Sequence, residues 1–324
     1  MKIVCDSKIP YIRETLEGIA DEVVFLHATD IKKADLTDAD ALIVRTRTRC
    51  DAELLEGSKV RFVGTATIGF DHIDTEYLAK RGIFWTNCPG CNSGSVCQYV
   101  RECLKAAIHE RAKSGLRSTT MAVIGHGHVG SKVARMAKDM GLDVYVYDPL
   151  LFPEQTFDKV YDCDIITFHT PLTKDGPYPT YHMADRGFFR RLTKKPVIIN
   201  AARGPVIDTA ALIDAKDRGI VSELVIDTWE NEPNISRELL KRCFIATPHI
   251  AGYSANGKVN ADNMIVRALC DFFNLPHPAE ITPPSDGQIG YNPMSDHNKL
   301  MANPELFERF REEYPVVLET STPL

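Results

Sequence analysis

The sequence predicts an α/β protein with two domains, each built on a parallel sheet. Short apolar runs of strand length alternate with stretches of helical pattern along most of the 324 residues, as in successive βαβ units. A polar break at residues 113–115 divides these runs into two series, and the length suits two domains of about 150 residues. The hydrophobic content of 44% is sufficient for a core in each domain.

The first series of strands occupies the N-terminal part of the chain. Its four apolar runs lie at residues 2–5, 41–44, 61–64 and 83–86. A helical pattern at residues 11–19 follows the first run. Because ligands gather at the carboxyl ends of parallel strands, we expect the loops at residues 45–47 and 65–67 to contact a substrate.

The second series is a domain in itself. Its six strands are expected at residues 121–124, 142–147, 164–168, 196–199, 223–226 and 244–246. Helices are expected at residues 93–113, 129–140, 209–217, 236–241 and 255–273. After Phe273 the chain becomes rich in proline and ends with a charged helical stretch at 304–313, so we expect a separate C-terminal segment over residues 274–324.

Composition excludes several classes of function. The chain has 38 basic and 44 acidic residues and a formal charge of −6, so nucleic acid is not expected as a partner. No apolar run approaches the roughly 20 residues of a membrane helix, and the start reaches Asp6 without a signal-peptide pattern. Nine cysteines, an odd number, favour reduced thiols. We therefore expect a cytoplasmic protein that contacts no membrane.

A glycine-rich turn carries the clearest motif. Residues 125–130 read G-H-G-H-V-G, which matches G-x-G-x-x-G between a predicted strand and a predicted helix. The first two glycines permit a tight turn and close approach to a pyrophosphate, and the third lets helix and strand pack closely. The helix N-terminus favours the negative charge of that group. The expected cofactor contacts here are Gly125, Gly127, His128, Val129 and Gly130.

The residue that ends the next strand selects the cofactor. Asp148 has the spacing of the acid that accepts hydrogen bonds from the adenosine ribose. Its charge would repel the additional phosphate of NADP, so we expect NAD. Thr170, after a further strand at the same sheet edge, is a second expected cofactor contact. The histidines of the glycine turn and the pair Cys88 and Cys91 lack further ligands at metal-binding spacing, so we expect no metal.

Three charged residues follow strands of the second series. They are Arg203, Glu232 and His249, the residue types that hydride transfer from a 2-hydroxy acid requires. An arginine binds the carboxylate with its planar fork. A histidine takes the hydroxyl proton, and a carboxylate orients that histidine.

At these residues the chain resembles the D-isomer-specific 2-hydroxyacid dehydrogenases, over roughly residues 2–273. The resemblance implies that Arg203, Glu232 and His249 are the catalytic residues. It adds further NAD contacts at Ala202, Asp227 and Gly252. It also implies a Rossmann-type doubly wound nucleotide domain, residues 92–253, inserted in a smaller flavodoxin-like α/β substrate domain. That domain would comprise residues 1–91 and 254–273.

Four segments resemble the branch of this family that oxidises 4-phospho-D-erythronate. They lie at residues 62–72, 89–92, 168–178 and 248–253. The D-G-P-Y run at 175–178 is the most specific, because other family members usually lack it. The resemblance implies substrate contacts from Thr46, Thr67 and Tyr253, with Arg45 and Arg47 close enough to help.

The tail departs from the pattern of this branch, which carries a C-terminal dimerisation domain. Here that domain is shortened internally to residues 274–324, and the helix at 307–314 resembles its end. A homodimer is still implied. Gln98 also stands where family members often carry glutamate.

The resemblance implies a specific reaction with a small phosphorylated 2-hydroxy acid. NAD would oxidise 4-phospho-D-erythronate at C2 to 2-oxo-3-hydroxy-4-phosphobutanoate, a step in the synthesis of pyridoxal 5′-phosphate. One alternative is another enzyme of the family, acting on phosphoglycerate or on glyoxylate or hydroxypyruvate. The other is an NAD-sensing binding protein without turnover, against which the three intact catalytic residues argue.

Overall fold

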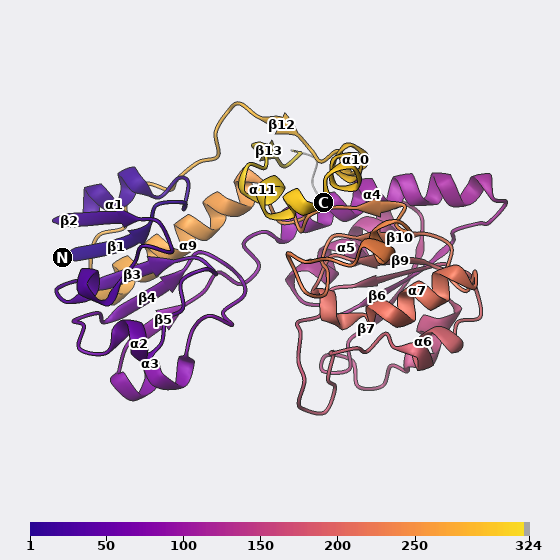
Figure 1. The fold of residues 1–324 in the computed structure, drawn as a ribbon, viewed down its shortest axis with the longest axis horizontal. Coiled ribbons are helices and arrows are strands. Elements are labelled where there is room, and N and C mark those ends of the chain that lie inside the picture. The colour runs from indigo at the N-terminus through magenta and orange to yellow at the C-terminus, as the bar shows by residue number, and fades with distance from the viewer. Residues whose placement is uncertain (321–324) are drawn as a thin grey trace. The chain divides into compact units, whose positions relative to one another are not determined.

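The computed structural model describes residues 1–320, and these form two compact units (Figure 1). The first unit comprises Met1–Asn92 and Ser254–Ser285, and the second comprises Ser93–Tyr253 and the chain from Asp286 onward. The tail after Phe273 therefore forms no unit of its own, in contrast to the separate segment 274–324 expected from the sequence. Its first part belongs to the first unit and the rest packs on the second.

The first unit is built on a five-stranded parallel sheet in the order β2-β1-β3-β4-β5. The strands are β1 (Lys2–Asp6), β2 (Glu22–Leu26), β3 (Ala41–Val44), β4 (Phe62–Thr65) and β5 (Phe84–Thr86). This is the flavodoxin-like order, with a switch point between β1 and β3. Strand β2 lies at the sheet edge and is only partly buried; its apolar run at residues 23–26 was not among the predicted strands.

Helices cover both faces of this sheet. They are α1 (Arg13–Ile19), α2 (Ala52–Leu55), α3 (Thr75–Arg81) and α9 (Ala255–Phe273). Ile3 and Cys5 of β1 join the core cluster that contains Ile265 and Leu269 of α9, whereas Val4 joins the cluster on the opposite face. Successive residues of a strand point to opposite faces. Burial of both faces thus produces the uninterrupted apolar runs that predict parallel strands.

The second unit has a six-stranded parallel sheet in the order β11-β10-β9-β8-β6-β7. The strands are β6 (Thr120–Ile124), β7 (Asp143–Tyr147), β8 (Ile165–Phe168), β9 (Val197–Asn200), β10 (Leu224–Ile226) and β11 (Ile245–Ala246). Its longer helices are α4 (Ser93–Lys113), α5 (His128–Asp139) and α7 (Thr209–Asp217), and two short ones are α6 (Arg186–Arg190) and α8 (Arg237–Leu240). The sheet has its switch point between β6 and β8, where doubly wound folds bind ligands.

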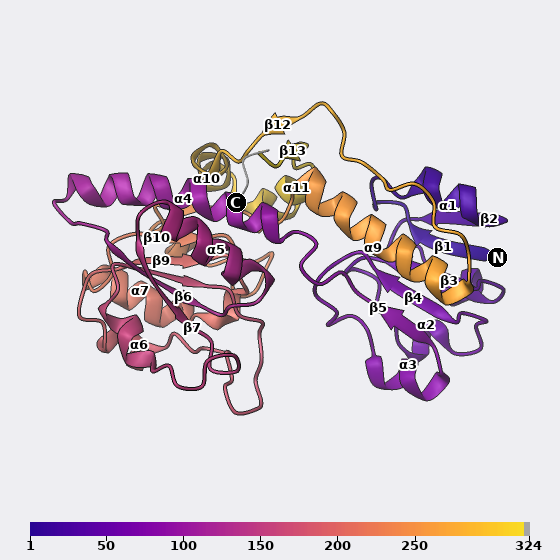
Figure 2. The ribbon, with the colours of Figure 1, turned by 180° about the vertical axis from the view of Figure 1, so that it is seen from behind.

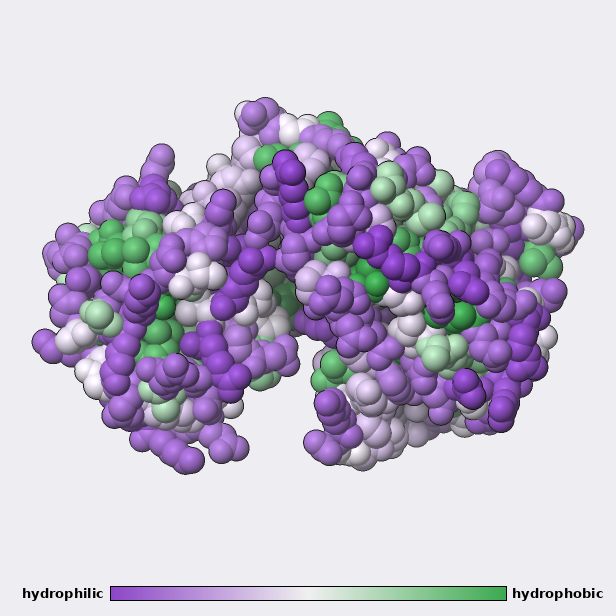
Figure 3. Space-filling view, in the orientation of Figure 1, coloured by the Kyte–Doolittle hydropathy of each residue, from purple (hydrophilic) through white to green (hydrophobic). Residues whose placement is uncertain are grey.

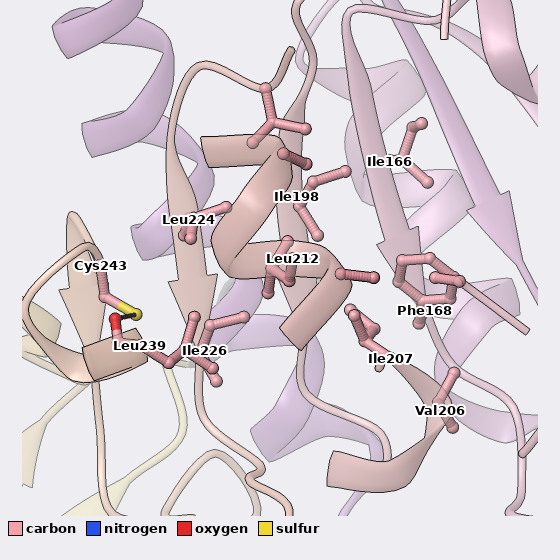
Figure 4. Close-up of a cluster of buried hydrophobic side chains, with 14 of the residues drawn as sticks. Ile166, Phe168, Ile198, Val206, Ile207, Leu212, Leu224, Ile226, Leu239 and Cys243 are labelled. Atoms are coloured by element: carbon pink, nitrogen blue, oxygen red, sulfur yellow. Dashed lines mark hydrogen bonds between the residues drawn. The ribbon is translucent and has the colours of Figure 1, made fainter. Parts of the chain in front are cut away.

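Two apolar cores sandwich this second sheet. In both ribbon views α4 and α5 lie on one face and α7 on the other (Figures 1 and 2). Figure 4 shows the core on the α7 side, where Leu212 faces Ile198 and Phe168 of the strands. These cores fix the strand ends and therefore the loops that follow them.

The chain beyond Asp286 packs against the second unit. It contains the paired strands β12 (Gln288–Ile289) and β13 (Val317–Leu318), and the helices α10 (Pro293–Ala302) and α11 (Phe307–Glu312). The Tyr291 hydroxyl lies 2.5 Å from Ser95 Oγ, and the backbone N–H of Ala246 donates to His297 Nδ1 at 3.1 Å. Phe307 is buried in the core of that unit. The tail is therefore fastened beside β11.

The surface seen in Figure 3 is mostly hydrophilic, with apolar residues in small scattered groups. Among the residues that the structure describes, no helix has the length and apolar character needed to cross a membrane.

Candidate active site

At two positions of the glycine turn after β6 there is no space for a side chain. Gly125 has a φ of +91°, and a Cβ there would lie 2.7 Å from the carbonyl oxygen of His169. A Cβ on Gly130 would lie 1.9 Å from the carbonyl oxygen of Gly125. Backbone therefore packs on backbone at both places. Gly127, the N-cap of α5, is exposed, so the turn presents the N-terminus of that helix at its surface.

Asp148 follows β7 and holds the turn. Its Oδ2 accepts a hydrogen bond from the backbone N–H of His126 at 2.8 Å, and its Oδ1 accepts one from Leu150 at 3.2 Å. The carboxylate is half-buried and retains lone pairs for a further donor. It thus stands beside the turn, where a ribose hydroxyl could donate to it.

Unpartnered polar atoms gather around the same edge of the sheet. Thr170 Oγ1, Thr228 Oγ1 and His126 Nδ1 are buried and lack a hydrogen-bond partner among the described residues. Buried polar groups rarely remain unpaired. Together with the glycine turn and the N-terminus of α5, these atoms fit a dinucleotide that carries hydroxyl and phosphate groups.

Arg203, Glu232 and His249 follow β9, β10 and β11, which are neighbours in the sheet. His249 Nδ1 lies 2.8 Å from Glu232 Oε2, and the other carboxylate oxygen accepts the backbone N–H of Trp229 at 2.8 Å. An ionised carboxylate can only accept, so Nδ1 carries the hydrogen of this bond. In the neutral imidazole, Nε2 is then left with the lone pair that can take a proton.

The electrostatics of this pair favour an ionised glutamate. Burial alone would raise the pKa of the Glu232 carboxyl, but His249, the Trp229 N–H and Arg311 together hold that pKa below its ordinary value. The His249 backbone has a φ of +56°, in the left-handed region that few residues other than glycine adopt. Such strain occurs where the surrounding structure fixes a functional residue.

Asp227 holds the loop that carries His249. Its side chain is buried, and its oxygens accept from Thr247 Oγ1 at 2.6 Å and from the backbone N–H groups of Ile250 and Ala251 at 2.8 and 3.1 Å. Burial raises the pKa of this carboxyl, although His249 and these hydrogen bonds oppose the rise. The structure thus gives Asp227 a role in positioning the loop, which the sequence did not reveal, while its contact with the cofactor stays a prediction.

Arg203 is fixed against the loop of Glu232 by the glycine that follows it. A Cβ on Gly204 would lie 1.9 Å from the carbonyl carbon of Trp229, so no larger residue fits. The Arg203 side chain is half-buried, and its Nη1 donates to the carbonyl oxygen of Ala202 at 2.8 Å. Sequence reasoning named Arg203 but not the close contact at Gly204, which has no local signal.

The predicted substrate residues of the first unit lie after β3 and β4, which are neighbours. Arg45 Nε donates to the buried Asp6 at 2.8 Å, so its charge already has a partner. Thr46 is exposed. Thr67 Oγ1 donates to the carbonyl oxygen of Gly69 at 2.9 Å, which fixes its rotamer. The structure therefore groups these three side chains at one sheet edge.

The remaining predicted residues lie in the second unit. Tyr253 is half-buried, and its ring meets that of Tyr314 edge-on at 6.2 Å between centroids. Gly252 precedes it in the loop after His249, and Ala202 is buried next to Arg203. The pair Cys88 and Cys91 is buried in the first unit as free thiols.

Comparison with known proteins gives consistent similarities. Residues 95–251 match the family model described as D-isomer specific 2-hydroxyacid dehydrogenase, NAD binding domain. The chain is 50% identical to the erythronate-4-phosphate dehydrogenase of Bacteroides thetaiotaomicron, over 98% of this chain and 96% of that protein. The enzyme of the same name from Porphyromonas gingivalis is 39% identical, over 97% and 92%.

Solved structures agree with these relatives. The D-lactate dehydrogenase of Aquifex aeolicus, complexed with NAD and lactic acid, is 25% identical with a TM-score of 0.68, over 84% of this chain and 95% of that one. The NAD⁺-bound 3-phosphoglycerate dehydrogenase of Entamoeba histolytica is 29% identical with a TM-score of 0.68, over 85% and 95%. The predicted α/β fold, the NAD cofactor and the dehydrogenase activity are thereby confirmed.

Asp148 should determine the preference for NAD over NADP. We predict that Asp148→Asn lowers the ratio of kcat/KM with NAD to kcat/KM with NADP about tenfold or more, because a charge-assisted hydrogen bond to ribose and the repulsion of a phosphate are both lost. Steady-state kinetics with both cofactors measures this ratio. Asp143→Asn, at the exposed start of the same strand, should leave the ratio unchanged. An unchanged ratio in Asp148→Asn would exclude this role.

Proposed function

This NAD-dependent dehydrogenase belongs to the D-isomer-specific 2-hydroxyacid dehydrogenase family, and we propose that it oxidises 4-phospho-D-erythronate at C2. The product would be 2-oxo-3-hydroxy-4-phosphobutanoate. The substrate is supported by relatives named erythronate-4-phosphate dehydrogenase that are 50% and 39% identical over nearly the whole chain. The chemistry is carried by one observation, the hydrogen bond between His249 and Glu232 at 2.8 Å.

In the proposed mechanism His249 is the base. Its Nε2 takes the proton of the C2 hydroxyl while C2 loses its hydrogen as hydride. A bound NAD would supply the acceptor for that hydride. Glu232 keeps Nδ1 protonated and stabilises the imidazolium that forms, as a carboxylate partner does in other acid–base pairs. Arg203 binds the substrate carboxylate with its planar fork.

The predicted substrate residues of the first unit offer groups that suit a phosphate. Thr46 and Thr67 present hydroxyl groups at the carboxyl ends of β3 and β4, and Arg45 adds positive charge that Asp6 holds in place. Hydroxyl and guanidinium groups suit a phosphate through charge-assisted hydrogen bonds. Because Arg45 is already paired, its proposed contribution is to position the loop and to raise the local potential.

We also propose a homodimer in the cytoplasm, acting in pyridoxal 5′-phosphate synthesis. The nine cysteines are all free and buried, which suits a reducing compartment. Ile289, Met294, Met301 and Val316 of the tail expose 38–73% of their surface, and exposed apolar groups suit an interface with a second copy. Analytical ultracentrifugation should give a mass twice that of the chain, and the mass of a single chain would contradict the dimer.

The pairing of Glu232 with His249 makes a prediction about pH. Glu232→Gln should lower kcat about 10²- to 10⁴-fold and move the acidic limb of the kcat/KM profile for oxidation to lower pH, since the carboxylate favours the protonated imidazole. The profile is measured by NADH formation between pH 5 and 10. Glu230→Gln is the matched control, because Glu230 bonds instead to His182 and to the Thr209 N–H. A limb that stays in place in Glu232→Gln would show that the two residues do not act together.

A substrate panel tests the proposed reaction. With saturating NAD, 4-phospho-D-erythronate should be oxidised with a much higher kcat/KM than D-erythronate, 3-phosphoglycerate or glycolate, the last two representing the other reactions of the family. Thr46→Val should reduce the preference for the phosphorylated acid over D-erythronate about tenfold, the scale of one hydrogen bond to a charged group. Higher kcat/KM for another acid would refute the substrate, and failure of every acid would favour an NAD-sensing protein.

A further inference from the structure

Helix α11 places an arginine beside Tyr253. The guanidinium carbon of Arg311 lies 5.8 Å from the centre of the Tyr253 ring and 6.0 Å from that of Phe307. Nη1 donates to Glu308 Oε1 at 2.8 Å, one turn earlier in the helix. The side chain is only 22% exposed. Arg311 is thus held in a largely aromatic setting, unlike a typical surface arginine.

One donor of this guanidinium has no partner. Arg311 Nε is buried and makes no hydrogen bond among the described residues. A buried N–H that meets no acceptor is unfavourable, because its lost hydration is not replaced. Glu308 occupies Nη1, and Nε remains an unsatisfied donor of this guanidinium.

A neighbour on the same helix shows that this arrangement is not required for the helix. Arg309 is 63% exposed and pairs with Glu313 four residues later, with Nε at 3.0 Å from the carboxylate. Pairs of this kind between exposed side chains stabilise a helix only weakly. Arg311 instead points its charge toward the interior of the second unit.

The positive charge of Arg311 affects the pKa of Glu232, the partner of His249. It contributes to the low pKa of the Glu232 carboxyl, after the larger effects of burial and of His249. It also opposes the rise that burial causes in the pKa of Tyr253. The tail is fixed here by the edge-on contact between Tyr253 and Tyr314. Arg311 and Tyr253 thus lie in the same unit as Glu232 and His249.

We propose that Arg311 is a specificity-determining residue that binds an anionic group of the substrate through its guanidinium, beside Tyr253. The inference rests on the proposed function, because 4-phospho-D-erythronate carries two such groups, a carboxylate and a phosphate. Both offer planar or tetrahedral oxygens that a guanidinium edge binds. The C-terminal segment is then part of the substrate site and not only of an interface.

The test compares Arg311→Gln with wild type on 4-phospho-D-erythronate and D-erythronate at saturating NAD. We expect KM for the phosphorylated acid to rise about 10- to 100-fold, the scale of a charge-assisted hydrogen bond, with kcat and the acidic limb of the pH profile little changed. A rise confined to the phosphorylated acid assigns the phosphate as the ligand. An equal rise for both acids assigns the carboxylate.

Arg309→Gln is the matched control and should leave every parameter unchanged. Arg311→Lys keeps the charge but lacks the planar fork, so its KM should lie between those of wild type and Arg311→Gln. If Arg311→Gln does not fold, the KM of Arg311→Lys is compared with that of wild type instead. NADH binding and the thermal midpoint monitor the fold of each variant. Unchanged KM for both acids would overturn the proposal. A loss in kcat with a displaced acidic limb would also overturn it, because Arg311 would then act through Glu232.

The proposed function can fail separately. A wild-type enzyme that oxidises another 2-hydroxy acid, and not 4-phospho-D-erythronate, would refute the proposed substrate alone. The same comparison of Arg311→Gln and Arg309→Gln on that acid would still decide the role of Arg311.

Discussion

The geometry of the site depends on the buried carboxylate of Asp227. Its hydrogen bonds to Thr247 Oγ1 and to two backbone N–H groups hold the loop after β11. Each such bond to a charged group contributes about 1.5–3 kcal/mol, enough to maintain the left-handed backbone of His249. Thr247 is held in turn by the Tyr99 hydroxyl at 2.6 Å. The proposed base is thus anchored through α4 to the core of the second unit.

Close backbone packing is the second constraint. Gly130 lies against Gly125, and Gly204 lies against Trp229, at separations that leave no room for a Cβ. The first contact presses α5 onto the turn after β6, so that the helix N-terminus reaches the cofactor site. The second brings the loop of Arg203 against the loop of Glu232. Both contacts position functional groups by excluding side chains.

Charge at the site is distributed so that each ionised group has a defined task. The buried side chain of Asp227 is occupied by its hydrogen bonds to the loop after β11. Glu232 stays ionised despite its burial, because His249 and Arg311 lower the pKa of its carboxyl. Asp6 in the first unit fixes Arg45 in the same way. Carboxylates therefore orient a loop and a histidine in the second unit and an arginine in the first.

The sequence alone determined the elements whose signal is local. Helices at 93–113, 209–217 and 255–273 were predicted with the bounds that the structure gives, because their apolar spacing and breakers lie within the segments themselves. Buried strands and the glycine turn were recognised for the same reason. Arg203, Glu232 and His249 could be proposed as catalytic residues because each follows such a strand.

Only the tertiary structure decided what depends on partners far apart in the chain. The pairing of Arg45 with Asp6 and the contact of Gly204 with Trp229 leave no local pattern. The tail looked like a separate segment because its prolines and charges resemble a linker, yet Phe307 enters the core of the second unit. In the sequence, Arg311 is one of several charged residues in a polar helix, and nothing local distinguishes it. Its burial beside Tyr253 follows from packing, which periodicity does not encode.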